Sequence, residues 1–578
     1  METTQRETPW SFLDAYRGTV FHGTWPTLPE LFTITAERYP DRTCFTVYDP
    51  DRISMTYAEA LATIHRVAGF LRSIKVRHGD RVAVTGKNSP EWAVAYLATL
   101  FAGAVVVPID YQLKDADIEK LISVSGAKAL FVDDERFDRM LSSKVVGKHV
   151  YSLSREQAPY IYSLESPASA DIEPAKEHEL AAILFTSGTT GTPKGVMLSH
   201  ANLVSDCLLA QANLEIYHTD IFYALLPLHH SYCMLAVFIE GISVGAEIVF
   251  GKRMVIKQIL HDLKAARVTM FLGVPMLFNK VLAGIMRGVR EKGLFVYGII
   301  RSLMVVSGLI KKVTGRNPGK KLFHTVLDKA SLATVRICIS GGGPLAPEVF
   351  RRYNQLGIDF VQGYGLTETS PILTLNPIYH YKETSVGKVI PNADMKIIDS
   401  DERGAGEIVV KGPMVMQGYY NLPDETAKVF THDGYFKTGD IGRLDHENYL
   451  YLTGRAKNLI VTEGGKNVYP EEIENCFQLY DEIDQILVRG YQADDQTRIE
   501  LIEALIHPNV DFFADGDGET SDGKRQIEER VNQIVAEVNQ QQLTPYQRIT
   551  RVTLLDEPLE MTTTKKIKRH VVGEEEPQ

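Results

Sequence analysis

The sequence predicts an α/β protein built from a large N-terminal domain and a small C-terminal domain. Its 578 residues exceed the size of one compact domain, so at least two are expected. Over residues 28–134, helix-like stretches alternate with short β-branched runs, a pattern typical of layered sheets covered by helices. After Asp394 the runs become shorter and are separated by turns rich in Gly and Asp. This change indicates a small sheet or β-barrel that closes the large domain.

The individual elements follow from residue spacing. Residues 57–74 carry apolar side chains at helical spacing and predict a helix. Strands are expected at 82–84, 105–109, 181–185, 268–273, 335–340, 395–398, 407–411 and 449–452. The segment that follows is mixed, and its amphipathic helix places five apolar residues on one face: Ile527, Val531, Ile534, Val535 and Val538. We therefore place a domain boundary near Arg455, which gives an α+β C-terminal domain over 455–578 after a large domain over 1–454.

Composition and charge exclude several classes of protein. With 44% hydrophobic and 23% charged residues, the chain has an ordinary globular composition. Its net charge of -11 argues against a general nucleic-acid binder. The five cysteines are scattered without a Cys-x-x-Cys pair, so neither a disulfide framework nor a zinc site is expected. Residues 1–7 lack the apolar core of a signal peptide, and the expected location is the reducing cytoplasm.

One segment, residues 285–321, raises the question of peripheral membrane contact. Residues 294–310 are mostly apolar, but they include Arg301 and look short for a membrane span. Basic residues surround them: Arg287, Arg290, Lys292, Lys311, Lys312, Arg316, Lys320 and Lys321. A basic and apolar stretch in an acidic protein suits a surface that meets anionic lipid. A helical excursion packed on its own domain would show the same pattern, so both interpretations stay open.

The most informative motif is Thr-Ser-Gly-Thr-Thr-Gly-Thr-Pro-Lys-Gly at residues 186–195. Glycines let backbone N–H groups point into one concavity, and hydroxyls and a lysine at its rim suit a polyphosphate. The common nucleotide loop is excluded because Lys194 is followed by Gly195 instead of Ser or Thr. An apolar strand precedes the loop, and Ser199 is the expected N-cap of the helix that follows. The predicted ATP-binding residues of this loop are Thr186, Ser187, Gly188, Thr189, Thr190, Gly191 and Lys194.

A second motif, Gln-Gly-Tyr-Gly-Leu-Thr-Glu-Thr, occupies residues 362–369 after a probable strand. Tyr364 offers a flat face for adenine, and Gly365 permits close approach of the backbone. Thr367 can donate a hydrogen bond to a phosphate, and Glu368 is a hard oxygen ligand for Mg²⁺. Alone, the octapeptide could be a strand end and helix cap, but the glycine loop upstream makes a nucleotide site the better interpretation.

Together these motifs resemble those of the adenylate-forming enzymes, which include acyl-CoA ligases, luciferases and adenylation domains of peptide synthetases. The resemblance covers residues 28–569, with the expected motifs in order. Two features make it closest to the fatty acyl-CoA ligases, particularly the long-chain branch. They are the insertion between Pro275 and Val335 and the sequence of residues 464–470. It implies three small molecules, namely a fatty acid, ATP with Mg²⁺, and coenzyme A as the acyl acceptor.

The resemblance also implies roles for individual residues. Adenine contact falls to Tyr364 and its neighbours, magnesium to Glu368 with Thr186, and the ribose hydroxyls to Asp440. The segment 227–232 places His230, and not His229, beside the carboxylate substrate. The C-terminal motif at 562–569 makes Lys566 the catalytic lysine, although Lys565 stands where many members carry glycine. The remaining ATP contacts are Gly342, Gln362, Gly363, Gly365, Thr367, Arg455 and Lys457, and the coenzyme A path is lined by Gly464, Gly465 and Lys466.

Family resemblance further implies a small domain that swings about a hinge at Lys457. The expected reaction has two steps, formation of an acyl-adenylate with release of pyrophosphate and then thioester formation with coenzyme A. Competing interpretations are an aryl-CoA or other carboxylic acid ligase of the same superfamily and a non-catalytic acyl-AMP binding protein. The oligomeric state stays open, with a homodimer as one candidate.

Overall fold

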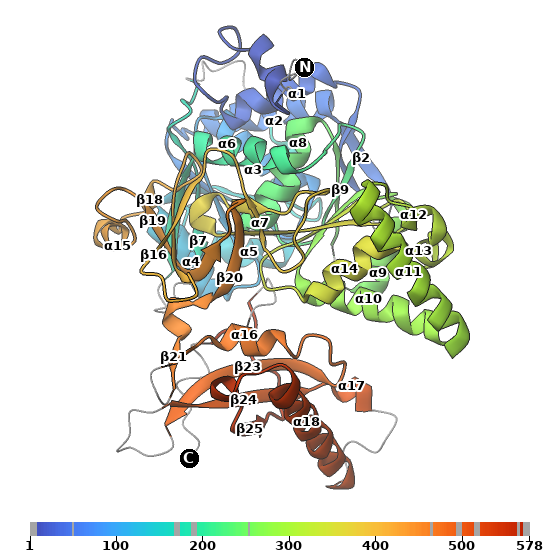
Figure 1. The fold of residues 1–578 in the computed structure, drawn as a ribbon. Helices are drawn as coiled ribbons and strands as arrows, with labels where there is room; N and C mark the ends of the chain where they lie inside the picture. Colours follow the sequence, from blue (N-terminus) through green and yellow to red (C-terminus); the bar gives the residue numbers. More distant parts are fainter. Residues whose placement is uncertain are drawn as a thin grey trace, which may run out of the picture.

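The computed structural model describes residues 8–48, 51–166, 174–186, 193–252, 255–462, 466–492, 500–513, 521–562 and 567–569. Figure 1 shows a large upper body of sheets and helices and a smaller C-terminal body beneath it. The upper body contains two large sheets with helices around them. The prediction of an α/β protein with layered mixed sheets is confirmed.

The first sheet has seven strands in the order β18-β8-β7-β4-β3-β5-β6. Its central strands pair in parallel and are buried, because helical crossovers cover them. The glycine loop joins two neighbouring antiparallel strands of this sheet, β7 and β8. Their bounds are β3 (Arg81–Thr85), β4 (Val105–Ile109), β5 (Ala127–Val132), β6 (Val150–Ser152), β7 (Leu180–Thr186), β8 (Lys194–Ser199) and β18 (Gly418–Tyr419).

The second sheet has thirteen strands in the order β16-β17-β19-β20-β15-β14-β13-β12-β11-β9-β10-β1-β2. One half is mostly parallel and comprises β1 (Thr43–Val47), β2 (Ile53–Thr56), β9 (Ile221–Ala224), β10 (Glu247–Phe250), β11 (Met270–Gly273), β12 (Ile337–Ser340) and β13 (Asp359–Gly365). The other half is antiparallel and consists of β14 (Ile372–Leu375), β15 (Gly387–Val389), β16 (Asp394–Ile398), β17 (Gly406–Lys411), β19 (Phe436–Leu444) and β20 (Tyr449–Arg455). Of these, β16, β17 and β20 match the strands expected after Asp394. The antiparallel half continues directly from β13.

Helices fill the space around the sheets. The helix predicted at 57–74 is α2 (Tyr57–Ser73), and its Thr56 cap accepts a hydrogen bond from the backbone of Glu59. Helix α3 is buried along its whole length, because its apolar residues cover all sides. Ser199 caps α6 as expected. The other helices include α1 (Leu28–Arg38), α3 (Pro90–Phe101), α4 (Asp115–Ser125), α5 (Asp134–Ser143), α6 (His200–Ala210), α7 (Ser231–Cys233), α8 (Glu240–Val244), α9 (Ile256–Ala265), α14 (Pro347–Leu356) and α15 (Pro423–Lys428).

The C-terminal residues surround a hydrophobic core of their own, which includes Ile460, Val488 and Ile506. A three-stranded sheet of β23 (Ile483–Gln492), β24 (Glu500–Pro508) and β25 (Arg551–Leu554) packs with α16 (Pro470–Asn475) and α18 (Ser521–Gln541). The five apolar residues predicted on one face of α18 are all buried in this core. A short α17 (Val510–Phe513) and the two-stranded pair β21 (Ile460–Val461) and β22 (Asn467–Val468) complete this part.

Between β11 and β12 lies a helical insertion of α10 (Pro275–Arg290), α11 (Leu294–Thr314), α12 (Gly319–Leu322) and α13 (His324–Lys329). Figure 1 shows it at the side of the upper body, beside α9 and α14. The apolar stretch at 294–310 looked short for a membrane span, but that length estimate was wrong. The helix continues to Thr314 and reaches 21 residues, because Arg301, Lys311 and Lys312 do not interrupt it. Among the described residues, α11 is the one helix long and apolar enough to cross a membrane by length and composition.

Candidate functional site

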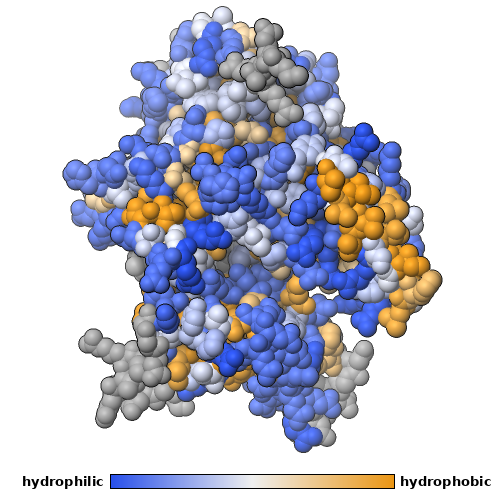
Figure 2. Space-filling model, in the orientation of Figure 1, coloured by the Kyte–Doolittle hydropathy of each residue, from blue (hydrophilic) through white to orange (hydrophobic). Residues whose placement is uncertain are grey.

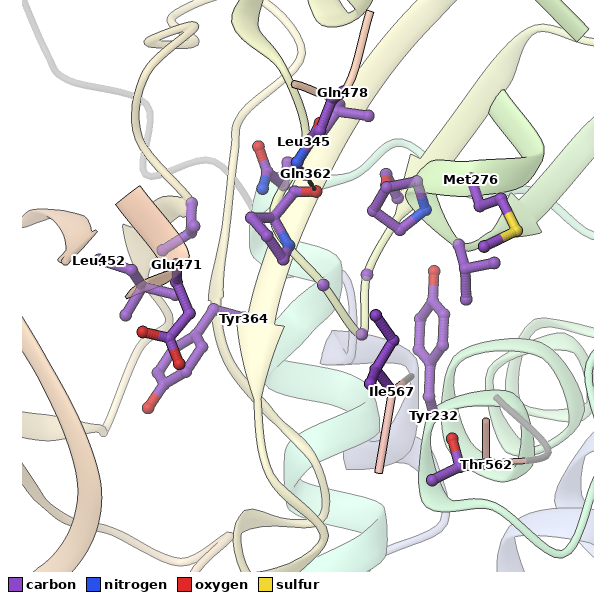
Figure 3. Close-up of a pocket in the computed structure, with 18 of the residues that line it drawn as sticks. Tyr232, Met276, Leu345, Gln362, Tyr364, Leu452, Glu471, Gln478, Thr562 and Ile567 are labelled. Carbon is purple, nitrogen blue, oxygen red and sulfur yellow. Dashed lines mark hydrogen bonds between the residues drawn. The ribbon is translucent and has the colours of Figure 1, made fainter. Parts of the chain in front are cut away.

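A cavity of about 2970 Å³ lies where the upper body faces the C-terminal part. It brings together predicted residues from strands of both large sheets and from the turns that follow them. Figure 3 shows Tyr232, Met276, Gln362 and Tyr364 around it, together with Glu471 and Ile567 from the C-terminal part. Thirteen predicted site residues line it: Thr186, Lys194, His230, Gly342, Gln362, Gly363, Tyr364, Gly365, Thr367, Glu368, Asp440, Arg455 and Lys457.

The other predicted site residues divide into two groups. Lys466 is exposed, and it is absent from the cavity lining. Its carbonyl accepts a hydrogen bond from the backbone of Thr462 across the β21–β22 turn. The rest lie outside the described residues: Ser187, Gly188, Thr189, Thr190, Gly191, Gly464, Gly465 and Lys566.

The two ends of the glycine loop lie opposite each other on β7 and β8. Thr186 pairs with Lys194 in the antiparallel register, and its hydroxyl lies 3.4 Å from the Lys194 carbonyl oxygen. The Lys194 ammonium contacts a carboxylate oxygen of Glu425 at 2.6 Å. It also lies 5.0 Å from the centre of the Tyr419 ring. The hydrogen bond from Lys194, with help from Lys428, lowers the pKa of Glu425 to about 2.

Neither partner of Lys194 was predicted from the sequence. Tyr419 reaches the loop because β18 pairs with β8, and Glu425 follows on α15. These residues are more than 200 positions from the loop and carry no local motif, so spacing alone could not reveal them.

Glu368 lies on the short helical turn after β13, where its carboxylate accepts a hydrogen bond of 3.0 Å from the Tyr419 hydroxyl. Tyr419 therefore touches both the loop lysine and the predicted magnesium ligand. The neighbouring Thr367 hydroxyl lies 3.1 Å from the Ser231 hydroxyl, at the start of α7. No cluster of three or more His, Cys, Asp or Glu that could hold a metal occurs in the described part of the chain. A lone carboxylate suits Mg²⁺ held jointly by protein and substrate phosphates, because Mg²⁺ seldom occupies an all-protein cage.

Asp440 lies at the centre of a polar cluster formed by three strands. Asp440 on β19 pairs with Arg455 on β20, and the Arg455 guanidinium donates to one oxygen of the Asp440 carboxylate at 2.9 Å. The Tyr364 hydroxyl from β13 donates to the other oxygen at 2.8 Å. Burial, and next the charge of Asp440, raises the pKa of Tyr364 well above its ordinary value, so the phenol stays a donor. Three strands of one sheet, of which β19 and β20 are neighbours, thus hold a nearly buried carboxylate that lines the cavity.

The histidine pair lies at the start of the helix that runs from α7 through a π-helical stretch at Met234–Ile239 into α8. The Nδ1 atom of His230 accepts a hydrogen bond from the Tyr232 backbone, which caps the helix. Both histidines line the cavity. His229 is also 3.5 Å from Asp110, yet burial outweighs that carboxylate and lowers the pKa of His229. Tyr232 extends into the cavity and donates to the Ile339 carbonyl at 3.0 Å.

Part of the cavity lining is apolar. Buried apolar side chains from five helices and strands and from one loop contribute to it: Ala210, Leu214, Phe222, Ala236, Met270 and Leu282. Glu240 also lines the cavity, and its carboxylate accepts a hydrogen bond from the Cys207 thiol at 2.7 Å. Burial raises the pKa of Glu240 to about 8. At neutral pH the Glu240 side chain is therefore mostly uncharged.

The C-terminal part closes one side of the cavity with residues of α16 and of the chain end. The Gln478 side chain donates to the Pro344 carbonyl at 3.1 Å, which connects this part to the loop after β12. Ile567 and Thr562, which flank the segment that contains Lys566, both line the cavity. Arg569 contacts the Glu474 carboxylate at 2.5 Å and 2.6 Å. The described end of the basic motif is thus anchored to the fold rather than a solvated tail.

Comparison with known proteins decides the family. The sequence profile described as AMP-binding enzyme matches residues 32–420, which is more than half of the chain. The chain belongs to the AMP-binding enzyme family. This membership confirms the prediction of an adenylate-forming enzyme.

Individual AMP-binding relatives agree on the family and differ in substrate. The chain is 30% identical over 565 residues to the long-chain-fatty-acid–CoA ligase FadD15 of Mycobacterium bovis, covering 90% of each protein. It is 28% identical to a feruloyl-CoA synthase of Amycolatopsis, covering 80% of this chain and 86% of that one. Among solved structures, ATP-bound MatB from Rhodopseudomonas palustris superimposes with a TM-score of 0.74 at 26% identity and covers 95% and 98% of the two chains. The relatives thus support an acid–CoA ligase without deciding which acid.

Proposed function

We propose that this enzyme converts a fatty acid, ATP and coenzyme A into acyl-CoA, AMP and pyrophosphate. The observation that carries the proposal is that buried apolar side chains line the same cavity as Lys194, Glu368 and Asp440. An apolar wall suits an alkyl chain, because each buried methylene contributes about 0.8 kcal/mol. The cluster around Asp440 suits a nucleotide ribose, since a carboxylate can accept hydrogen bonds from two hydroxyls.

In the first step, a carboxylate oxygen of the acid attacks the α-phosphorus of ATP, and the bond to pyrophosphate breaks. Two anions must approach each other, which costs about 1 kcal/mol per charge pair at 4 Å in water and about 4 kcal/mol at a partly buried site. We assign Lys194 and the loop amides to the β- and γ-phosphates and Lys566 to the α-phosphate. Mg²⁺ held by Glu368 and Thr186 would supply further positive charge beside the phosphates.

For Lys194 to meet phosphate, its ammonium must exchange the Glu425 carboxylate for a phosphate oxygen. Both side chains are partly exposed, so the pair can open toward the cavity. Tyr419 would keep its position beside Lys194 and Glu368 through that exchange, because its backbone is held in β18 against β8. We assign His230 to the carboxylate of the acid, because it lines the cavity at the start of the helix that carries Tyr232.

In the second step, the coenzyme A thiol attacks the acyl carbon, and the bond to AMP breaks. One fixed arrangement can hardly serve both steps, because Lys566 would occupy the path of the thiol. We therefore propose domains at 1–454 and 455–578 that change their relative orientation about Lys457, bringing Gly464, Gly465 and Lys466 to the cavity for the second step. The separate hydrophobic core of the C-terminal part supports such a movement.

The direct test is AMP release from ATP, measured with and without coenzyme A, over hexanoate, palmitate, benzoate and ferulate. The proposal expects coenzyme-A-dependent turnover with palmitate preferred over the two aromatic acids. A clear preference for benzoate or ferulate would replace the fatty acid with an aryl acid, the second candidate that the feruloyl-CoA synthase relative favours. Nucleotide binding without turnover on any acid would support the non-catalytic alternative.

A further inference from the structure

Helix α11 carries an apolar surface that nothing in the described structure covers. Figure 2 shows hydrophobic side chains gathered on the side of the molecule where Figure 1 places the helical insertion. Phe295 is 82% exposed, Val313 75% and Leu294 72%, and further exposed apolar residues lie between them: Ile299, Leu303, Val305, Val306, Leu309 and Ile310. At 100° per residue, most of these side chains share one broad face of the helix. Exposed apolar patches of this kind mark interaction sites.

The opposite face of α11 is held firmly in the fold. Met304, Ser307 and Lys311 are buried there. The Lys311 ammonium contacts the Asn354 amide oxygen on α14 at 2.5 Å and the Asp359 carboxylate at the start of β13 at 2.6 Å. Lowering a charged lysine and its acid into lipid would be costly, so α11 is not arranged to leave the protein and span a bilayer. The apolar face is instead displayed outward by a fixed helix.

Charge around this face is opposite in sign to the rest of the protein. Residues 285–321 contain nine Lys and Arg and one acidic residue, Glu291, so their net charge is +8. The whole chain carries -11. Seven of the basic residues are exposed: Arg287, Arg290, Lys292, Arg301, Lys312, Arg316 and Lys321. An apolar face with a basic surround matches the acyl chains and headgroups of an anionic bilayer. A symmetric contact with a second copy would instead oppose two positive surfaces.

We propose that α11 lies in the interfacial plane of an anionic lipid bilayer and docks the enzyme there. The insertion also contributes to the cavity, which is lined by Arg287 and Arg290 of α10 and by Tyr297 of α11. If the proposed function holds, docking places the α10 side of the cavity next to the bilayer, into which long-chain acids partition. The docking itself does not depend on the activity.

The test is co-sedimentation of the full-length protein with vesicles of phosphatidylcholine alone and with about 30% phosphatidylglycerol, at low and high salt. Wild type should bind the anionic vesicles, and salt should weaken that binding because the basic residues contribute through the surface potential. The double variant V306E/V313E should lower partitioning roughly tenfold or more. The variant V124E, which changes an exposed valine on α4, is the matched control and should bind like wild type.

Two further measurements keep the outcome decisive. All variants should retain the melting temperature of wild type, since Val306 and Val313 are exposed. Sedimentation velocity should show that the apolar face does not pair two copies. Equal vesicle binding by V306E/V313E and wild type would overturn the proposal, as would a dimer that dissociates in this variant without any vesicle binding. Turnover of hexanoate in solution should be unchanged in V306E/V313E. If neither wild type nor any variant turned over an acid, that result would count against the proposed function and would not affect the docking result.

Discussion

The ammonium of Lys194 lies 2.6 Å from a carboxylate oxygen of Glu425, across 231 positions of sequence. The lysine at the end of the glycine loop is thus paired with an acid before any phosphate arrives. Tyr419 lies beside both the lysine and Glu368, so the pair belongs to one connected polar cluster. Glu425 must give way when Lys194 meets a phosphate, and this exchange makes the contact testable.

Substitution of Glu425 by Gln should tighten ATP binding. The variant removes the anion that competes for Lys194, and a partly exposed ion pair contributes no more than about 1 kcal/mol, so the gain in affinity should stay within about fivefold. ATP affinity can be measured by calorimetry without acid or coenzyme A. The neighbouring exposed Asp424, changed to Asn, is the control and should leave affinity unchanged. Weaker ATP binding in Glu425→Gln would instead mean that Glu425 positions Lys194.

Substitution of Asp440 by Asn should abolish discrimination between ATP and 2′-deoxy-ATP. Hydrogen bonds to a charged acceptor contribute about 1.5–3 kcal/mol, so kcat/KM for ATP should fall about tenfold or more. The ratio of kcat/KM for the two nucleotides should approach one, because the carboxylate no longer selects the hydroxyl. Tyr364→Phe removes one donor from Asp440 and should retain most of the discrimination. An unchanged ratio in Asp440→Asn would place the ribose elsewhere.

Substitution of Lys566 by Ala should impair only the first half of the reaction. The lysine is proposed to neutralise the α-phosphate during adenylation, and it should be dispensable when the acyl-adenylate is supplied. Pyrophosphate release from acid and ATP measures the first step, and AMP release from supplied acyl-adenylate and coenzyme A measures the second. Lys565→Ala is the adjacent control and should retain both activities. Equal loss of both steps in Lys566→Ala would refute the division of labour.

Substitution of Glu240 by Gln should change how stability depends on pH. Burial raises the pKa of Glu240 to about 8 in the folded protein, whereas the same carboxyl in the unfolded chain ionises near its ordinary pKa of 4.5. The unfolded state therefore binds fewer protons between these values, so wild-type stability falls as pH rises from about 4.5 to 8. Gln removes this contribution. The melting temperature of the variant minus that of wild type should therefore increase as pH rises through this window. The exposed Glu402→Gln should show no such trend, and parallel pH profiles for Glu240→Gln and wild type would contradict the assignment.

Much of the site could be predicted because its motifs are local. The glycine-rich motif and the apolar run before it could be identified from residue types alone, and the structure places Thr186 at the end of the expected strand, opposite Lys194. The strand leading to Tyr364 and the run at 449–452, which β20 extends to Arg455, were likewise visible as short apolar runs, whereas β19, which carries Asp440, was not expected as a strand. Their approach to one another depends on the register of β19 with β20 and on the position of β13, neither of which is encoded by spacing within a single run.

The sequence by itself determined the order of these motifs, the class of the fold and the apolar character of residues 294–310. Tertiary structure alone decided that Glu425 meets Lys194, that Glu240 is buried beside Cys207, and that α11 turns an apolar face outward. The physical reason is that exposure depends on what packs against a side chain. The sequence of a largely apolar helix such as α11 is compatible with either a buried or a solvent-exposed apolar face. Here the contact of Lys311 with Asp359 determines which face of α11 packs against the protein.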